Sequence, residues 1–174
     1  MLCSVYLIIL SNRKVDNMAW LIADTHFCHT NIIRYCNRPF ANAKEMNEYI
    51  IQQWNNTVTK EDTVYHLGDF GFGGRKTITN LVNQLNGNII LILGNHDRHG
   101  KQWFLDCGFT EVYRRLKIGS YVLTHRPQTL DKLNGCINIH GHTHGRNESL
   151  DKDKYIDVSV ETINYKPIWI DIKG

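Results

Sequence analysis

The sequence has no run of lysine or arginine, no C-x-x-C pair and no apolar stretch long enough to cross a membrane. Without a basic run, a net charge of +3 gives no argument for binding to nucleic acid or to a membrane surface. The five cysteines are odd in number and scattered, which fits reduced thiols in a cytoplasm better than a disulfide framework or a zinc ribbon. We therefore expect a cytoplasmic protein that does not associate with membranes.

Residues 1–17 stand apart from the rest of the chain. The apolar segment Leu2–Leu10 lacks the positive start and the small-residue cleavage site of a signal peptide. Because Met18–Asp24 looks like the natural first strand, residues 1–17 are expected to be an extra edge strand or an extension from an upstream start, and the extension is preferred. Residues 18–174 suffice for a single domain, and no repeat or linker divides them.

Hydrophobic periodicity predicts strands and helices in alternation over the first two thirds of the chain. The expected strands are 20–24, 63–67, 89–93 and 136–140. The expected helices are 43–54, 76–85 and 101–107, and residues 31–40 are expected to contain an apolar turn of helix that stops at Pro39. Gly119-Ser120, between 111–118 and 121–124, is a hairpin signal, and 154–160 with 166–172 is expected to form a closing antiparallel pair. This order predicts an α/β fold of two packed sheets with helices outside them.

Polar side chains follow the ends of the expected strands. The segment Asn88–Leu93 is typical of a strand buried on both faces, and after Gly94 come Asn95, His96 and Asp97. Gly94 is expected to allow a sharp turn there. In open α/β sheets, ligands bind outside the carboxyl ends of strands. Similar motifs recur along the chain as Asp24-x-His26, Gly68-Asp69, Thr124-His125 and Gly141-His142-x-His144.

These motifs carry the side chains of a metal site. Residues i and i+2 of an extended segment point the same way, so Asp24 with His26, and His142 with His144, are each expected to reach into one site. Carboxylate, imidazole and amide ligands without thiolate suit manganese, iron or zinc. A single such motif is not specific, but five that each end a plausible strand are, and they supply enough ligands for two metals.

As an ordered set, the five motifs resemble the calcineurin-like metallophosphoesterase superfamily, from about Met18 to the end of the chain. Segments 24–40 and 158–167 are similar to the small stand-alone members of bacteria and phages. The resemblance implies a calcineurin-like αββα sandwich and a metal-dependent phosphoric ester hydrolase. Relative to many members, the longer segment 27–56 places additional helical residues beside the site.

The resemblance also implies a role for each motif residue. One divalent metal ion would be bound by Asp24, His26 and His144, a second by Asn95, His125 and His142, and Asp69 would bridge both. Manganese is expected, with iron, zinc or nickel as alternatives. A hydroxide that bridges the metals would attack phosphorus in line, while His96 stabilises the transition state or protonates the leaving oxygen and Asp97 orients its ring.

Four further residues are candidate substrate contacts: His29, Arg38, Arg98 and Arg126. An arginine can clamp a phosphate with two parallel hydrogen bonds, although surface salt bridges are the alternative for the three arginines and solvation is the alternative for His29. His66 and His140 lie inside strands and are interpreted as core histidines.

The sequence therefore predicts a phosphoesterase, a phosphatase or phosphodiesterase that acts on small phosphomonoesters or phosphodiesters of nucleotide type, as a monomer or a small homo-oligomer. A nuclease acting on DNA or RNA is the alternative within enzymes. It would need an aromatic and basic groove, for which the candidates are Arg34, Tyr35, Arg38, Phe40 and Trp54. A non-catalytic scaffold of the same fold is disfavoured, because every ligand position is filled.

Overall fold

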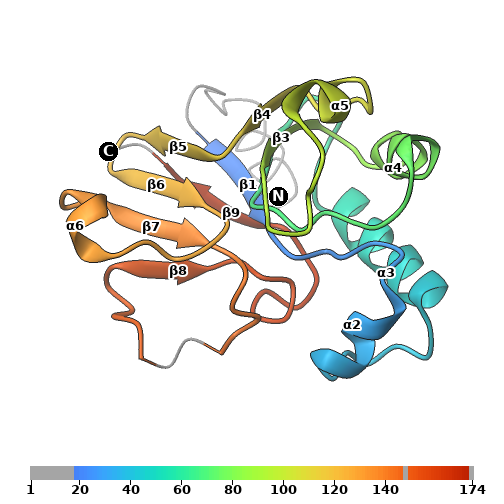
Figure 1. Ribbon diagram of the computed structural model, residues 1–174, viewed down its shortest axis with the longest axis horizontal. Helices are drawn as coiled ribbons and strands as arrows, with labels where there is room; N and C mark the ends of the chain where they lie inside the picture. Colours follow the sequence, from blue (N-terminus) through green and yellow to red (C-terminus); the bar gives the residue numbers. More distant parts are fainter. Residues whose placement is uncertain (1–17, 147–148, 173–174) are drawn as a thin grey trace, which may run out of the picture.

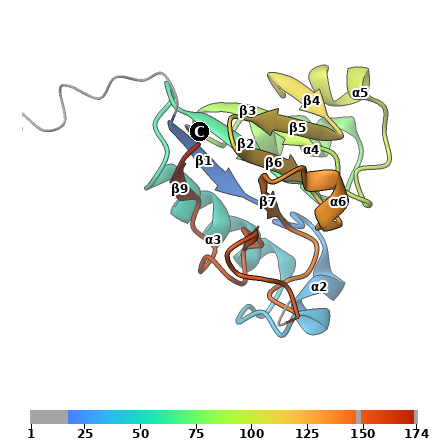
Figure 2. The ribbon, with the colours of Figure 1, turned by 90° about the vertical axis from the view of Figure 1, so that its left-hand side faces the viewer.

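Two β-sheets lie face to face, with helices outside them (Figures 1 and 2). The computed structural model describes residues 18–146 and 149–172, so the extension expected for residues 1–17 lies outside the described part of the chain. Both sheets contain parallel and antiparallel pairs. The α/β sandwich of two mixed sheets that the sequence predicts is confirmed.

The larger sheet has five strands in the order β4-β3-β2-β1-β9. Its strands are β1 (Met18–Ile22), β2 (Thr63–His66), β3 (Asn88–Ile92), β4 (Glu111–Tyr113) and β9 (Ile168–Asp171). Strands β1 to β4 are parallel, and β9 runs antiparallel to β1 at the edge. Parallel pairing brings the carboxyl ends of β1, β2 and β3 to one edge of the sheet, where the predicted site residues follow.

The smaller sheet has the order β5-β6-β7-β8. Its strands are β5 (Arg115–Ile118), β6 (Tyr121–Thr124), β7 (Ile137–His140) and β8 (Tyr155–Asp157). The predicted hairpin at Gly119-Ser120 is confirmed, with Ile118 opposite Tyr121. Strands β6, β7 and β8 are parallel, so the carboxyl ends of β6 and β7 also lie together.

Five helices complete the described residues. They are α2 (Thr30–Tyr35), α3 (Ala43–Asn55), α4 (Arg75–Val82), α5 (Lys101–Leu105) and α6 (Leu130–Leu133). The Asn42 side chain caps α3 by accepting a hydrogen bond from the Glu45 amide at 3.0 Å, which satisfies an otherwise unpaired donor. Among the described residues, no helix combines the length and the apolar character that crossing a membrane requires.

Alternate residues of the strands face two different apolar layers. Leu21 and Ile92 of the larger sheet pack with Leu123 and Ile139 of the smaller sheet. Their neighbours in β1 to β3 face the opposite way, onto α3 and α4, where the buried residues include Trp54 of α3. Each such side chain contributes about 1.5–3 kcal/mol when it is fully buried, so the two layers fix the sheets relative to each other and to the helices.

The closing antiparallel pair expected for 154–160 and 166–172 is wrong. Strand β8 pairs with β7 in the smaller sheet, and β9 pairs with β1 in the larger sheet. Between them, Ser159 forms a parallel bridge with Ala23, and the Val160 amide donates to the carbonyl of Ala23. The chain therefore crosses from one sheet to the other at this point, which brings residue 161 beside the end of β1.

Two further boundaries differ from those expected. The expected strand 111–118 is divided at Arg114, because β4 belongs to the larger sheet and β5 to the smaller one. The helical turn expected within 31–40 is α2, which ends at Tyr35 rather than at Pro39, and Asn37 adopts a left-handed backbone conformation with φ of 49°, which a continuing helix does not allow.

Candidate metal centre

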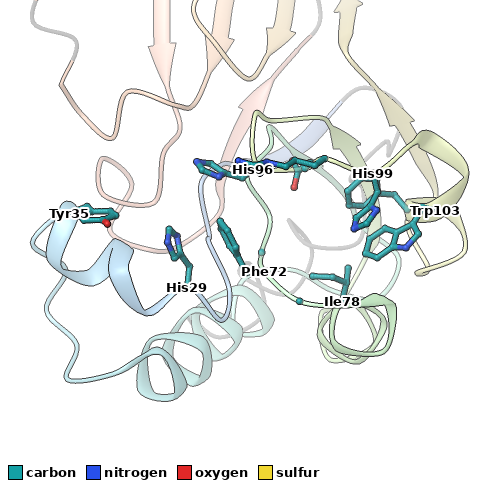
Figure 3. A pocket seen from close by; sticks show the side chains of 12 residues that line it. His29, Tyr35, Phe72, Ile78, His96, His99 and Trp103 are labelled. Carbon is teal, nitrogen blue, oxygen red and sulfur yellow. The ribbon is translucent and has the colours of Figure 1, made fainter.

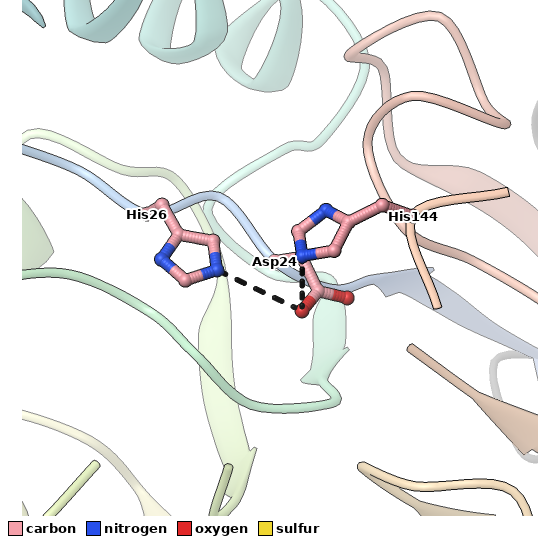
Figure 4. A group of neighbouring side chains, drawn as sticks. All are labelled: Asp24, His26 and His144. Atoms are coloured by element: carbon pink, nitrogen blue, oxygen red, sulfur yellow. Dashed lines mark ion pairs between the residues drawn. The ribbon is translucent and has the colours of Figure 1, made fainter. Parts of the chain in front are cut away.

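The loops at the carboxyl ends of β1, β2, β3, β6 and β7 converge on one site between the two sheets. Among the described residues, three groups of three side chains have ligand atoms within 4.8 Å of one another, and two of these groups consist entirely of predicted metal ligands. The first group is Asp24, His26 and His144 (Figure 4), and the second is Asp69, His125 and His142. Asn95 joins the second group, with its Oδ1 3.0 Å from Nε2 of His125. All seven predicted metal ligands therefore lie together.

The first group contains buried polar atoms that make no hydrogen bond. Oδ1 of Asp24 lies 3.9 Å from Nε2 of His26 and 3.8 Å from Nε2 of His144. Among the described residues, Asp24 Oδ1 and His26 Nε2 are buried atoms without a hydrogen bond. Unsatisfied buried polar atoms are rare, and a cation placed between such a carboxylate oxygen and such ring nitrogens would satisfy them.

The second group is linked to the first through Asp69. Oδ2 of Asp69 lies 3.4 Å from Nε2 of His125 and 3.5 Å from Nε2 of His26. When His125 is neutral and donates from Nδ1 to the Leu67 carbonyl at 2.8 Å, its Nε2 lone pair faces the Asp69 and Asn95 oxygens. A backbone acceptor that fixes the ring in this way is typical of metal-binding histidines, so this donor set also fits a cation.

Burial and neighbouring charges determine the protonation of the ligands. Burial lowers the pKa of His26 to about 2 and, together with His125, that of His142 to about 4. Burial raises the pKa of Asp24 to about 7. Burial also acts to raise the pKa of Asp69, but the hydrogen bond and charge of His125 outweigh it and hold that pKa below its usual range. For His125 and His144, hydrogen bonds and neighbouring carboxylates outweigh burial, so the pKa of His125 is raised and that of His144 is raised to about 10. Because a metal ion binds neutral imidazole, His26 and His142 are ready to bind one, whereas a cation at His125 and His144 would displace a proton.

Five of the seven predicted ligands have a left-handed backbone conformation. They are Asp24, His26, Asp69, His142 and His144, with φ between 48° and 68°. The side chains of Asp24 and His26, and of His142 and His144, do meet as expected. The expected reason, an extended backbone, is wrong. Residues other than glycine adopt the left-handed conformation at a cost of about 1–3 kcal/mol, and such residues cluster at functional sites.

At two positions, a carboxylate of the site lies so close to the backbone that only glycine fits. A Cβ on Gly94 would lie 2.2 Å from Oδ1 of Asp69, and a Cβ on Gly141 would lie 2.3 Å from Oδ2 of Asp24. The chain bends at Asn95 and His96, directly after Gly94, as expected from the sequence. Gly94 does not have a positive φ, so what requires glycine there is the close approach of the Asp69 carboxylate to the backbone.

Arg38 lies behind the first group rather than in position to clamp a substrate. It is 4% exposed, and its guanidinium donates to the carbonyls of Asp24 and Thr25 at 2.7 and 3.0 Å. It also forms an ion pair with Glu161 at 2.7 Å, and Glu161 in turn accepts from Nδ1 of His144 at 3.0 Å. Its donors are thus occupied, and the substrate contact predicted for Arg38 does not fit its position.

Asp97 holds the backbone of the site rather than the ring of His96. Its carboxylate accepts hydrogen bonds from the amides of Asp69, Phe70 and Gly94 at 2.8, 3.2 and 2.8 Å. These bonds tie the loops after β2 and β3 together. The orienting role expected for Asp97 is therefore replaced by one on the main chain that carries Asp69.

The remaining predicted contacts are at the open side of the site. His29 is half-buried and its Nδ1 lies 3.2 Å from Nδ1 of His26, within hydrogen-bond distance. Arg98 is exposed, and so is Arg126, whose Nη2 lies 3.3 Å from Oδ1 of Asn95. His96 is partly exposed, with Nε2 4.0 Å from Oδ2 of Asp69. These four side chains remain available to a substrate.

The core histidines are placed as expected. His66 and His140 are fully buried. His66 Nε2 lies 2.9 Å from the Thr25 hydroxyl, which itself donates to the carbonyl of Phe70. The aromatic groove considered for a nuclease does not form from the expected residues, because Trp54 is a fully buried core residue.

A cavity of about 400 Å³ opens beside the metal centre (Figure 3). His29, His96 and Arg98 line it, together with Phe72 and Trp103, which the sequence analysis did not single out. Glu161 is a further residue at the site that the sequence motifs do not include. A local signal for Phe72 is its place between Gly71 and Gly73, three residues after Asp69. Nothing local in the sequence connects Glu161 with Arg38 or His144.

Three comparisons place the chain among known proteins. The calcineurin-like phosphoesterase family matches residues 19–172. The uncharacterized protein MJ1445 of Methanocaldococcus jannaschii is 43% identical over 176 residues, which cover 94% of this chain and 90% of that protein. The crystal structure of AQ665, a protein of unknown function from Aquifex aeolicus, has a TM-score of 0.67 and 31% identity, over 87% of this chain and 95% of that one.

A nuclease is also among the similar structures. The crystal structure of Pseudomonas putida nuclease MPE has a TM-score of 0.51 and 21% identity, over 72% of this chain and 61% of that one. At this level of identity, the likeness shows a shared fold alone.

Proposed function

Because the chain belongs to the calcineurin-like phosphoesterase family and is a metal-dependent phosphoesterase, we propose that it hydrolyses small phosphomonoesters or phosphodiesters of nucleotide type with two divalent cations. The observation that carries this proposal is the pair of neighbouring ligand groups, in which the buried atoms Asp24 Oδ1 and His26 Nε2 make no hydrogen bond.

In this proposal, each ligand group holds one cation. Asp24, His26 and His144 hold the first, His125, His142 and Asn95 hold the second, and Asp69 lies between them. The distances of 3.5 Å from Asp69 Oδ2 to His26 Nε2 and of 3.4 Å to His125 Nε2 support the shared position of Asp69. Mixed oxygen and nitrogen ligands favour manganese, with iron, zinc or nickel as alternatives.

The two cations, when bound, would lower the pKa of a water molecule and offset the charge of the phosphoryl group. The protein supplies the rest. His96 can donate a proton to the leaving oxygen or a hydrogen bond to the phosphoryl group, because it lies beside Asp69 but belongs to neither ligand group. The exposed Arg98 and Arg126 would neutralise the substrate's remaining charge, and His29 would contact the part of the substrate nearest His26.

The test is hydrolysis of bis(4-nitrophenyl) phosphate and 4-nitrophenyl phosphate by metal-stripped protein, with and without added Mn²⁺. Asp69→Ala should lose metal binding and turnover together. His96→Ala should keep both cations in calorimetric titration and lose about 10²–10⁴-fold in kcat, the usual range for a general acid. Exposed Glu48 on α3 offers a control, since Glu48→Ala should match the wild type.

Each result decides a different part of the proposal. Turnover that returns with Mn²⁺ and is lost in both site variants supports it, and the ratio of the two rates assigns the ester class. Failure to bind any divalent cation would overturn the enzyme proposal in favour of a scaffold. One bound cation per chain with full activity would overturn the two-metal arrangement.

A nuclease is the second candidate, because an aromatic cavity adjoins the ligand groups and a structure of the same fold is named a nuclease. Aromatic side chains beside positive charge are what single-stranded nucleic acid requires. A 5′-labelled single-stranded DNA and RNA of about ten nucleotides would be incubated with the Mn²⁺-loaded protein. Cleavage of internal bonds at rates above those for dinucleotides favours the nuclease, and preference for the dinucleotide favours a small substrate.

A further inference from the structure

The cavity beside the metal centre is walled by aromatic rings on two sides (Figure 3). On one side the Phe72 ring packs on His29, with 4.1 Å between ring centroids. On the other side Trp103 of α5 stacks on His99, at 3.9 Å between centroids and 14° between the rings. Gly71 and Gly73 also line the cavity, where they add no side chain of their own, and Ile78 lies between the two aromatic sides.

The shape and chemistry of this cavity suit a flat aromatic group. Aromatic faces on two sides offer stacking that every nucleobase can use, whatever its hydrogen-bonding edge. The cavity's volume of about 400 Å³ lies in the range of sites that bury small organic ligands. An aliphatic chain or an inorganic phosphate would leave most of these aromatic faces without a partner.

The charges of the cavity admit an anionic substrate. Asp97 is the acidic residue of the lining, and its carboxylate is occupied by three backbone amides. Arg98 contributes a positive charge at the same wall. A nucleotide that enters therefore meets no free carboxylate along this lining.

His96 is where the cavity meets the ligand groups. It lines the cavity, while its Nε2 lies 4.0 Å from Oδ2 of Asp69. None of the seven predicted metal ligands lines the cavity. A group bound between the aromatic walls would therefore be joined to phosphorus through the ester oxygen nearest His96. This is the oxygen to which His96, acting as a general acid, would donate a proton.

We propose that this cavity binds the base of the nucleoside that departs. The protein then releases a nucleoside with a free hydroxyl, while the phosphate product is the part held at the metal centre. The inference rests on the proposed phosphoesterase activity. In the step, a water oxygen forms a bond to phosphorus and gives up one proton to the solvent, and the bond from phosphorus to the nucleoside oxygen breaks. The electron pair of that bond stays on the nucleoside oxygen, which takes a proton from His96.

A nucleotide with two competing leaving groups tests the assignment. The methyl ester of adenosine 5′-phosphate can release either adenosine or methanol, two primary alcohols of similar intrinsic leaving ability. The Mn²⁺-loaded protein should yield adenosine and methyl phosphate. Predominant release of methanol and adenosine 5′-phosphate would overturn the inference, because the base would then lie on the retained side or outside the cavity.

Variants of the aromatic wall connect the outcome to the cavity. Trp103→Ala should lower kcat/KM for adenosine release by about 5- to 150-fold, the range for loss of one base-stacking side chain, and Trp103→Phe should restore most of it. Trp169, which is 43% exposed on β9 and outside the lining, is the control, and Trp169→Ala should match the wild type. Equal values for Trp103→Ala and the wild type would overturn the inference.

A binding measurement separates this inference from the proposed function. Adenosine should quench tryptophan fluorescence in the wild type and not in Trp103→Phe, whereas ribose should quench neither. If bis(4-nitrophenyl) phosphate is hydrolysed but adenosine does not quench, the base site fails and the phosphoesterase stands. If adenosine quenches but no ester is hydrolysed under any metal, the proposed function fails instead.

Discussion

Arg38 and Glu161 form an ion pair across 123 residues of sequence, with Nε and Nη2 of the arginine 2.9 and 2.7 Å from Oε1 of the glutamate. Arg38 also holds the carbonyl of Asp24, and Glu161 holds Nδ1 of His144. One ion pair thus connects two members of the first ligand group. A carboxylate that fixes a ligand histidine is a recurring support of metal sites, and its loss typically lowers metal affinity by 10–100-fold.

Glu161→Gln should therefore weaken the binding of one of two Mn²⁺ ions by about 10–100-fold and leave the other nearly unchanged. The substitution keeps the size of the side chain but removes the charge that faces Arg38 and His144. Calorimetric titration of the metal-stripped protein measures both affinities. Glu48→Gln on the exposed face of α3 is the control. Equal affinities of Glu161→Gln and the wild type for both ions would show that the ion pair does not support the metal centre.

The clustering of the candidate ligands could be predicted from the sequence because its signal is local. Each ligand follows an apolar segment, and a buried strand with a polar residue at its end is visible within ten residues. Parallel strands then place these ends at one edge of a sheet, so Asp24, Asp69 and Asn95 were expected together. The sandwich itself followed from the same alternation of strands and helices.

The errors have non-local causes. Glu111–Ile118 contains no glycine or proline, and so nothing local marks Arg114 as the point where the chain passes between sheets. Strands β8 and β9 lie close in sequence but pair with β7 and β1, which belong to different sheets. The left-handed conformation of Asp24 and His26 is a strained state that packing imposes, and local preference argues against it.

Asp97→Asn should lower the free energy of unfolding by about 1–3 kcal/mol, because one of the buried amides that its carboxylate satisfies would face an NH₂ group. Urea unfolding of the metal-stripped protein measures this directly. If Asp97 instead acted through the ring of His96, the variant would unfold like the wild type and lose only kcat. Asp106→Asn, at an exposed ion pair with Arg75, is the control and should change stability by less than about 1 kcal/mol.

Gly94→Ala should be far more damaging than Gly74→Ala. A methyl group on Gly94 would meet the Asp69 carboxylate at 2.2 Å, whereas nothing lies within 4 Å of the corresponding position on Gly74. Relief of this clash requires Asp69 to move, so both stability and Mn²⁺ affinity should fall, with a stability loss of about 1–3 kcal/mol. Unfolding and metal titration of the two variants give the comparison. Wild-type metal affinity in Gly94→Ala would show that Asp69 does not need this close approach.

His66 connects the core to the site through hydrogen bonds on both ring nitrogens. Its Nδ1 accepts from the Gly68 amide at 3.2 Å, and its Nε2 lies 2.9 Å from the Thr25 hydroxyl. A second proton would turn Nδ1 from an acceptor into a donor facing an N–H group. Burial, as the main cause, lowers the pKa of His66 to about 3, against 6.5 for the free side chain.

Between about pH 3 and pH 6.5, the unfolded chain therefore binds a proton at His66 that the folded chain does not. The free energy of unfolding should fall as the pH drops through this window, by up to about 1.4 kcal/mol per pH unit from this residue, and this residue should contribute no slope above about pH 7. His66→Gln keeps a donor and an acceptor but cannot titrate. Urea unfolding with a chelator at pH 4.5, 5.5 and 7.5 should give a shallower slope for the variant, and parallel slopes would show that His66 titrates alike in both states.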